Sequence, residues 1–229
     1  MILYIIFGIL LGAIIPFIAG RFGKLIPMDP GLLILRMFHL PKFPKANDPM
    51  RHYILLKKWK KLCFFSLAWG IIVSVLFLLC FYFLPPSIRL WGCVFCWILA
   101  VSMVIDAQFW LLPDFFTIPL LLLGFVFAYQ FPEMGTQNAL IGSIAGYLIS
   151  VVSVMILGTL SKNPQFGGGD LKMITAIGAW LGILGLNYAL ILSFLLFVIL
   201  NALPVQKKGA YGPALGIASI IAFFVLYIK

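Results

Sequence analysis

The chain has 229 residues, of which 64% are hydrophobic and only 10% charged, and its mean hydropathy is +1.16. This composition lies outside the range of soluble globular domains. Because a helix satisfies its own backbone hydrogen bonds in lipid, and about 20 apolar residues cross the hydrocarbon core, we predict an all-α fold, a polytopic membrane helix bundle.

About eight membrane spans are predicted. The first has no basic n-region and no small-residue cleavage site, so we interpret it as a mature helix. The stretch 171–203 is too long for one span and could hold two short helices or one long broken helix; a turn between Gly182 and Gly185 is favoured. The predicted spans are 2–20, 63–84, 88–105, 115–132, 138–160, 171–184, 187–204 and 212–228.

The largest extramembrane segment is 21–62, which is rich in proline and basic residues and too small to build a large core. Within it, 29–37 is predicted as a short interfacial helix and 52–61 as a basic helical entry into the second span. Two roles stay open, a solvated loop that faces lipid and a surface that meets a cytoplasmic substrate segment. We therefore predict two parts, 1–62 and a membrane-embedded domain at 63–229.

The net charge of +10 would suit a nucleic-acid partner, but its placement indicates topology instead. With eight spans, fourteen of the sixteen Lys and Arg residues lie in segments on one side or at their immediate flank. The positive-inside rule makes that side cytoplasmic and places both termini outside. The expected contact is with membrane lipids, and no nucleic-acid partner is predicted.

All four cysteines fall in or at the edges of predicted spans. Cys93 and Cys96 have a spacing seen in zinc and redox sites, yet they lie among Trp, Phe and Ile in mid-span. Since free cysteines are often buried, we interpret Cys63, Cys80, Cys93 and Cys96 as small packing residues.

Two of the six acidic residues, Asp106 and Asp170, lie at span ends that the topology places on the cytoplasmic side. A charged side chain in mid-membrane costs about 2.5–3.5 kcal/mol on insertion scales, so such residues suggest function. If the two carboxyl groups approach closely they share one proton. One could then take a proton from water while the other protonates or polarises a peptide carbonyl, and no metal is needed.

Residues beside this pair have several interpretations. Pro113 is predicted to end any helix that continues from Asp106, and Asp114 to be the N-cap of the next helix. The run Gly167, Gly168 and Gly169 before Asp170 could be a flexible loop or a place where a substrate backbone approaches the carboxylate.

Taken together, these stretches resemble the type IV prepilin peptidases, within the intramembrane aspartyl proteases that have a Gly-x-Gly-Asp motif. The resemblance runs from about residue 65 to the C-terminus. Its matching stretches are Ile105-Asp106, Leu111-Leu112-Pro113-Asp114, Thr117-Ile118-Pro119, Phe166 through Lys172, and Tyr211-Gly212-Pro213-Ala214-Leu215.

The resemblance implies removal of leader peptides from prepilins or pseudopilins, in type IV pili or type II secretion, at the cytoplasmic face of a bacterial inner membrane. It matches Asp106 and Asp170 to the catalytic pair. The expected substrate-binding or supporting residues are Gly167, Gly168, Gly169, Pro113, Asp114 and Lys172.

The N-terminal part departs from the family pattern. Many members carry two Cys-x-x-Cys pairs in the first cytoplasmic loop, which bind zinc, and they methylate the new N-terminus with S-adenosylmethionine. The segment 21–62 has no cysteine, so no zinc site is expected there. Residues 12–21 look like a degenerate family motif with Pro16 in place of asparagine, which leaves methylation, and with it S-adenosylmethionine as a cofactor, open.

Two other classes of function are alternatives. A small proton-coupled transporter would use both carboxylates as an ion relay and place them near mid-bilayer. A non-catalytic subunit of a secretion machine would need no close pair.

Overall fold

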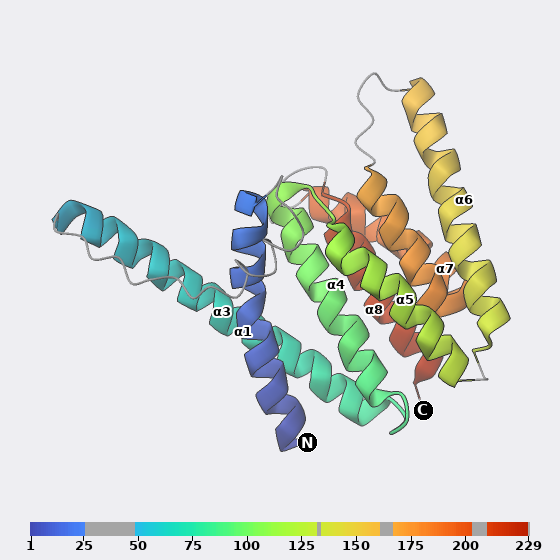
Figure 1. Cartoon of the computed structure of the whole chain (residues 1–229), viewed down its shortest axis with the longest axis horizontal. Helices are drawn as coiled ribbons and strands as arrows, with labels where there is room; N and C mark the ends of the chain where they lie inside the picture. The colour runs from blue at the N-terminus through green and yellow to red at the C-terminus, as the bar shows by residue number, and fades with distance from the viewer. Residues whose placement is uncertain (26–48, 132–133, 161–166, 203–209, 229) are drawn as a thin grey trace. The chain divides into compact units, whose positions relative to one another are not determined.

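The computed structural model describes residues 1–25, 49–131, 134–160, 167–202 and 210–228 (Figure 1). Throughout these ranges the regular elements are helices, which confirms the predicted all-α fold. The helices are α1 (Ile2–Leu25), α3 (Pro49–Phe83), α4 (Arg89–Phe109), α5 (Asp114–Gln130), α6 (Thr136–Leu160), α7 (Gly168–Ala202) and α8 (Gly212–Tyr227).

Among the residues that the structure describes, five segments are long and apolar enough to cross a membrane, which confirms a polytopic bundle. They are Ile2–Gly20, Lys60–Phe83, Arg89–Phe109, Thr136–Ile156 and Gly168–Ala202. The predicted spans 115–132 and 212–228 correspond to α5 and α8, which are apolar but shorter, at 17 and 16 residues.

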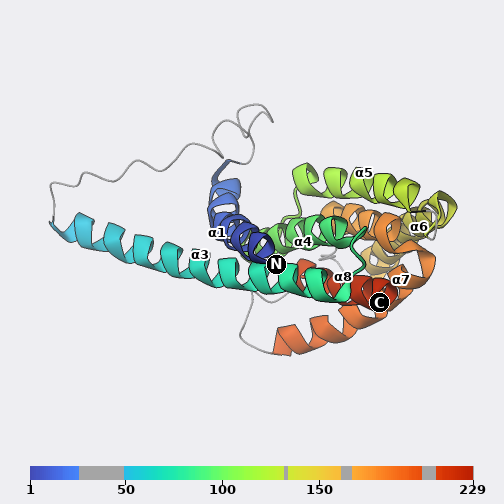
Figure 2. The ribbon, with the colours of Figure 1, turned by 90° about the horizontal axis from the view of Figure 1, so that it is seen from below.

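Helix α7 is broken where the sequence predicted a break. Gly182 has φ 65° and ψ −173°, so two helical halves meet at this residue, and Figure 2 shows α7 change direction sharply. Two side chains bind the backbone beside the break. The Ile183 N–H donates to Asn138 Oδ1 at 3.3 Å, and the Tyr227 hydroxyl donates to the Trp180 carbonyl at 3.3 Å. Such partners are needed because lipid offers backbone groups no hydrogen bonds.

The chain divides into two compact units, Met1–Leu79 and Cys80–Lys229, with the boundary inside α3. In the first unit α1 lies against α3 through small residues. A Cβ at Gly8 would lie 2.5 Å from Ser74 Cα, and the Ser74 hydroxyl donates to the Ile5 carbonyl at 3.1 Å. The predicted helical entry at 52–61 is confirmed as part of α3, whereas the predicted helix at 29–37 lies outside the described residues.

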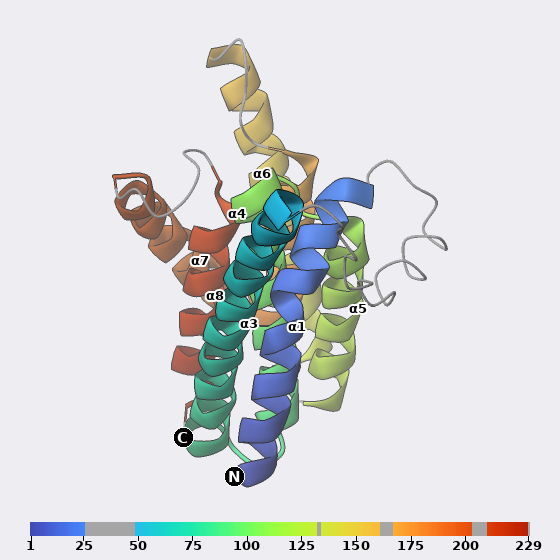
Figure 3. The ribbon, with the colours of Figure 1, turned by 90° about the vertical axis from the view of Figure 1, so that its left-hand side faces the viewer.

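In the second unit α7 packs against α5, α6 and α8, and α8 also packs against α4. Figure 3 shows α8 beside α7. Gly142 and Gly178 let α6 and α7 approach so closely that a Cβ on Gly178 would lie 2.2 Å from the Gly142 carbonyl oxygen. Aromatic rings fill the core, where the buried Trp180 stacks on Phe127 and donates to the Leu120 carbonyl at 2.7 Å.

The cysteines are free thiols. Cys80, Cys93 and Cys96 are buried, which agrees with a packing role, whereas Cys63 is exposed.

Candidate active site

Asp106 lies in the last turn of α4 with only 5% of its surface exposed. The helix ends at Phe109 because Trp110 adopts a left-handed conformation, φ 56° and ψ 37°, and its N–H donates to the Asp106 carbonyl at 2.8 Å. The helix that continues past Asp106 therefore does not reach Pro113, which was predicted to end it. The helix stops before the proline, and the segment 110–113 connects it to α5.

The side chain of Asp106 is held by the start of α8. Its Oδ2 accepts a hydrogen bond of 2.8 Å from the N–H of Gly212, the first residue of that helix. A Cβ at Gly212 would lie 2.7–2.9 Å from atoms of the Asp106 side chain, so this approach requires glycine. The partial positive charge of a helix N-terminus also favours a carboxylate at this place.

Asp170 is positioned in a similar way in the first turn of α7, where it is 9% exposed. Its Oδ2 accepts from the Gly167 N–H at 3.0 Å, while its own N–H donates to the Gly167 carbonyl at 3.1 Å. Each aspartate thus has one carboxyl oxygen bound to a backbone amide.

The two aspartates lie near enough for their carboxyl groups to interact electrostatically. Tyr211, at the N-cap of α8, is a third polar residue near this site. Its hydroxyl forms a hydrogen bond with the hydroxyl of the buried Ser193, and the phenol interacts electrostatically with Asp170. Burial raises the pKa of Tyr211 above its usual value, the bond to Ser193 lowers it, and Asp170 raises it again, so the phenol stays protonated at neutral pH.

Sequence reasoning included Tyr211 and Gly212 in the resemblance but gave them no role. The available signal was a Gly-Pro pair at the start of an apolar segment. This local signal does not show that Gly212 binds Asp106 or that Tyr211 interacts with Asp170.

The three glycines before Asp170 differ in their surroundings. Gly167 donates its amide to Asp170, and a Cβ at Gly168 would meet no atom of the described residues within 4 Å. At Gly169 a Cβ would lie 2.8 Å from Leu112 Cβ and 3.0 Å from the Leu112 carbonyl oxygen. The close approach at Gly169 is therefore to the chain's own 110–113 segment.

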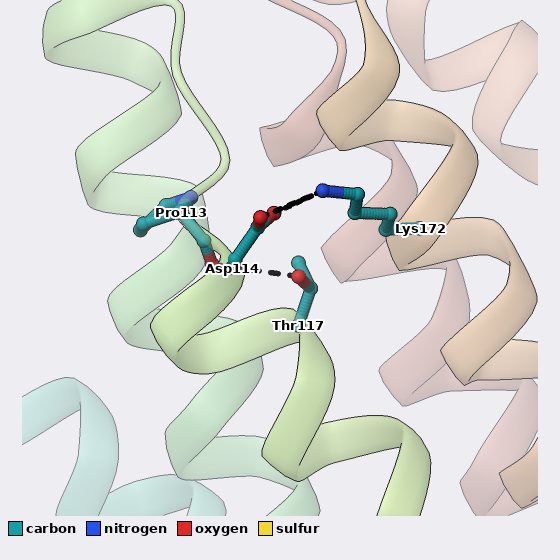
Figure 4. Close-up of polar contacts among 4 residues, drawn as sticks. All are labelled: Pro113, Asp114, Thr117 and Lys172. Carbon is teal, nitrogen blue, oxygen red and sulfur yellow. Dashed lines mark hydrogen bonds and ion pairs between the residues drawn. The ribbon is translucent and has the colours of Figure 1, made fainter. Parts of the chain in front are cut away.

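Asp114 forms an ion pair with Lys172 (Figure 4). Both carboxylate oxygens accept from Lys172 Nζ, at 2.6 and 2.7 Å, and the side chains are 56% and 46% exposed. The prediction of an N-cap at Asp114 is wrong. Pro113, with an extended backbone at φ −75° and ψ 139°, occupies the N-cap, which makes Asp114 the first helical residue and leaves its carboxylate to reach across to α7.

No group of three or more His, Cys, Asp or Glu side chains is placed to hold a metal ion among the residues that the structure describes. Most of the segment 21–62, for which the sequence predicted no zinc site, lies outside those residues.

Residues 93–202, which include both aspartates, match the model of the type IV leader peptidase family. A prepilin leader peptidase/N-methyltransferase of Dickeya chrysanthemi is 31% identical over 187 residues, covering 76% of this chain and 66% of that protein. The proteins of the same name from Vibrio cholerae and Neisseria gonorrhoeae are 31% identical over 190 residues and 35% identical over 122 residues. These alignments cover 79% and 52% of this chain, and 74% and 43% of those relatives. No solved structure matches the chain significantly.

Proposed function

This chain belongs to the type IV leader peptidase family, and on that premise we propose that it is a membrane aspartic endopeptidase that removes leader peptides from prepilins or pseudopilins. The observation that carries the proposal is the pair of buried, interacting carboxyl groups of Asp106 and Asp170, each bound by an amide at the start of a helix. Both lie in the matched region and within the predicted domain 63–229.

In the proposed reaction the two carboxyl groups approach closely enough to hold one shared proton between them. The ionised group takes a proton from a water molecule, whose oxygen attacks the carbonyl carbon of the scissile peptide bond. The protonated group gives its proton to the carbonyl oxygen. When the tetrahedral intermediate collapses, the C–N bond breaks, the leaving amine takes the proton that the first carboxylate accepted from water, and a hydroxyl of the intermediate returns a proton to the second carboxylate.

The neighbouring residues have supporting roles in this proposal. We propose that an extended substrate backbone passes Gly168 next to Asp170, because a Cβ at this glycine would meet no described atom within 4 Å. Gly167 and Gly169 hold the carboxylate and the 110–113 segment, respectively. Pro113 fixes the start of α5, from which Asp114 reaches Lys172.

The proposed location is a bacterial inner membrane with the site at the cytoplasmic face. The support for this face is the distribution of lysine and arginine in the sequence. The substrate proteins and membrane lipids are the proposed partners.

The names of the relatives also include N-methyltransferase. The proposed hydrolysis needs no S-adenosylmethionine, and the same assay, run with and without it, decides whether this chain also transfers a methyl group.

The test is mass spectrometry of a purified prepilin incubated with the purified protein in detergent, with and without S-adenosylmethionine. We expect cleavage after the glycine that precedes the hydrophobic segment of the substrate. Asp106→Ala and Asp170→Ala should each abolish cleavage while the protein remains inserted and monodisperse. Cleavage at the normal rate by either variant would contradict the proposal and favour a transporter or a non-catalytic subunit.

A further inference from the structure

We propose that the Asp114–Lys172 ion pair, together with the Gly169–Leu112 contact beside it, is a clamp that fixes the segment following Asp106 to the start of the helix that carries Asp170. This inference rests on the proposed peptidase function. It makes Asp114 and Lys172 positioning residues for cleavage.

The places of the clamp residues in the chain support this role. Asp114 begins α5, directly after the 110–113 segment that follows the helix of Asp106. Lys172 lies on α7, two residues after Asp170. Figure 4 shows the lysine reaching from α7 to α5. The clamp therefore ties together two elements whose relative position sets the geometry of the two carboxyl groups.

The contact at Gly169 gives the clamp a second point of attachment. A Cβ there would lie 2.8 Å from Leu112 Cβ, and Leu112 is itself buried. The glycine lies between Gly168 and Asp170, so the tight contact is immediately next to the catalytic carboxylate in the chain. A steric contact and an ion pair thus hold the same two segments.

The electrostatics of the two helix ends explain why the charges pair. A cation in the first turns of a helix is unfavourable, and this is where Lys172 lies on α7, whereas an anion at the first residue of α5 is favourable. Pairing with Asp114 neutralises the lysine. Among the described residues the acidic side chains are Asp106, Asp114 and Asp170, of which only Asp114 is exposed.

Because both partners are about half exposed, the pair contributes little to the stability of the fold. Its removal should instead be visible in catalysis, where a displacement of about 1 Å can lower a rate by about a hundredfold. We therefore expect a loss in kcat without a comparable change in KM or in unfolding temperature.

The experiment measures kcat and KM for prepilin cleavage by the full chain in detergent. Asp114→Ala and Lys172→Ala should each lower kcat by about ten- to a hundredfold with KM within about twofold. The exchanged double variant, Asp114→Lys with Lys172→Asp, should restore most of the kcat that the single variants lose. Lys172→Arg keeps the positive charge and should retain most of the wild-type kcat. Gln137→Ala, which removes an exposed polar side chain in the first turn of α6, is the control and should leave kcat unchanged.

Single variants with normal kcat, or an exchanged variant no more active than the singles, would overturn the clamp. A rise in KM in both single variants without a loss of kcat would also overturn the clamp, and would instead assign Asp114 and Lys172 to substrate binding. Asp106→Ala in the same assay keeps the two proposals apart. If it abolishes cleavage while Asp114→Ala does not slow it, the peptidase stands and the clamp falls.

Discussion

At the scale of single residues, each aspartate accepts a hydrogen bond from a backbone amide, but the two amides lie at different distances along the chain. Asp170 receives its amide from Gly167 in its own loop, whereas Asp106 receives one from Gly212, 106 residues away. In both cases Oδ2 is occupied. The position of Asp106 therefore depends on how α8 docks against α4, so the proposed catalytic role of Asp106 predicts that activity is sensitive to changes at the first residue of α8.

Gly212→Ala should lower kcat by more than about tenfold, because the added methyl would overlap the Asp106 carboxyl group and move it. Gly216→Ala, one turn further along α8, is the matched control. Its methyl would lie 2.4 Å from Met103 Cγ, so it disturbs the packing of α8 against α4 without touching Asp106, and we expect a smaller loss of kcat than at Gly212. Cleavage kinetics of both variants decide the point. Equal losses would show that the docking of α8 in general, rather than the contact with Asp106, limits activity.

At the scale of elements, the broken helix α7 connects the site to the core. Its first half carries Asp170, and its second half carries Ser193, which binds Tyr211. The break between them has a backbone conformation that is essentially restricted to glycine, and Asn138 fits directly against it. The relative direction of the two halves is thus fixed at one residue.

Gly182→Ala should destabilise the protein by about 1–3 kcal/mol from backbone strain alone. The contact adds to this, since the new Cβ would lie 2.4 Å from the Asn138 side-chain nitrogen. The unfolding midpoint in detergent measures the loss. Gly20→Ala is the control, because a Cβ there would meet no atom within 4 Å in the described part of the chain, and alanine is the better helix former. A variant at Gly182 as stable as the Gly20 variant would contradict the assigned strain.

The elements show what could be predicted from sequence. The spans and the break at Gly182 were predictable because hydropathy and glycine placement are local properties. The N-cap at Asp114 was wrong by one residue, since the extended backbone of Pro113 decided where α5 begins. The bonds from Gly212 to Asp106 and from Lys172 to Asp114 join residues 106 and 58 positions apart. Such partners follow from how the helices dock, which periodicity and composition do not specify.

At the scale of the whole molecule, the length of α4 bears on where the site lies in the membrane. Asp106 is seventeen residues beyond Arg89, the first residue of α4. At a rise of 1.5 Å per residue the two are about 26 Å apart along the helix axis, close to the thickness of the hydrocarbon core of about 30 Å. If the segment before α4 lies outside, as the charge distribution predicts, Asp106 lies near the cytoplasmic boundary.

This orientation can be tested with single cysteines in a Cys63→Ser background, in which the remaining native cysteines are buried. Ser87→Cys lies on the exposed turn before α4, and Thr159→Cys is exposed at the end of α6. A membrane-impermeant maleimide added to intact spheroplasts should label the first and not the second, and Thr159→Cys should react only after the membrane is opened. The reverse pattern would place the aspartates on the outer face and would contradict cleavage at the cytoplasmic side. It would also show that the placement of lysine and arginine, on which that side was assigned, misleads in this chain.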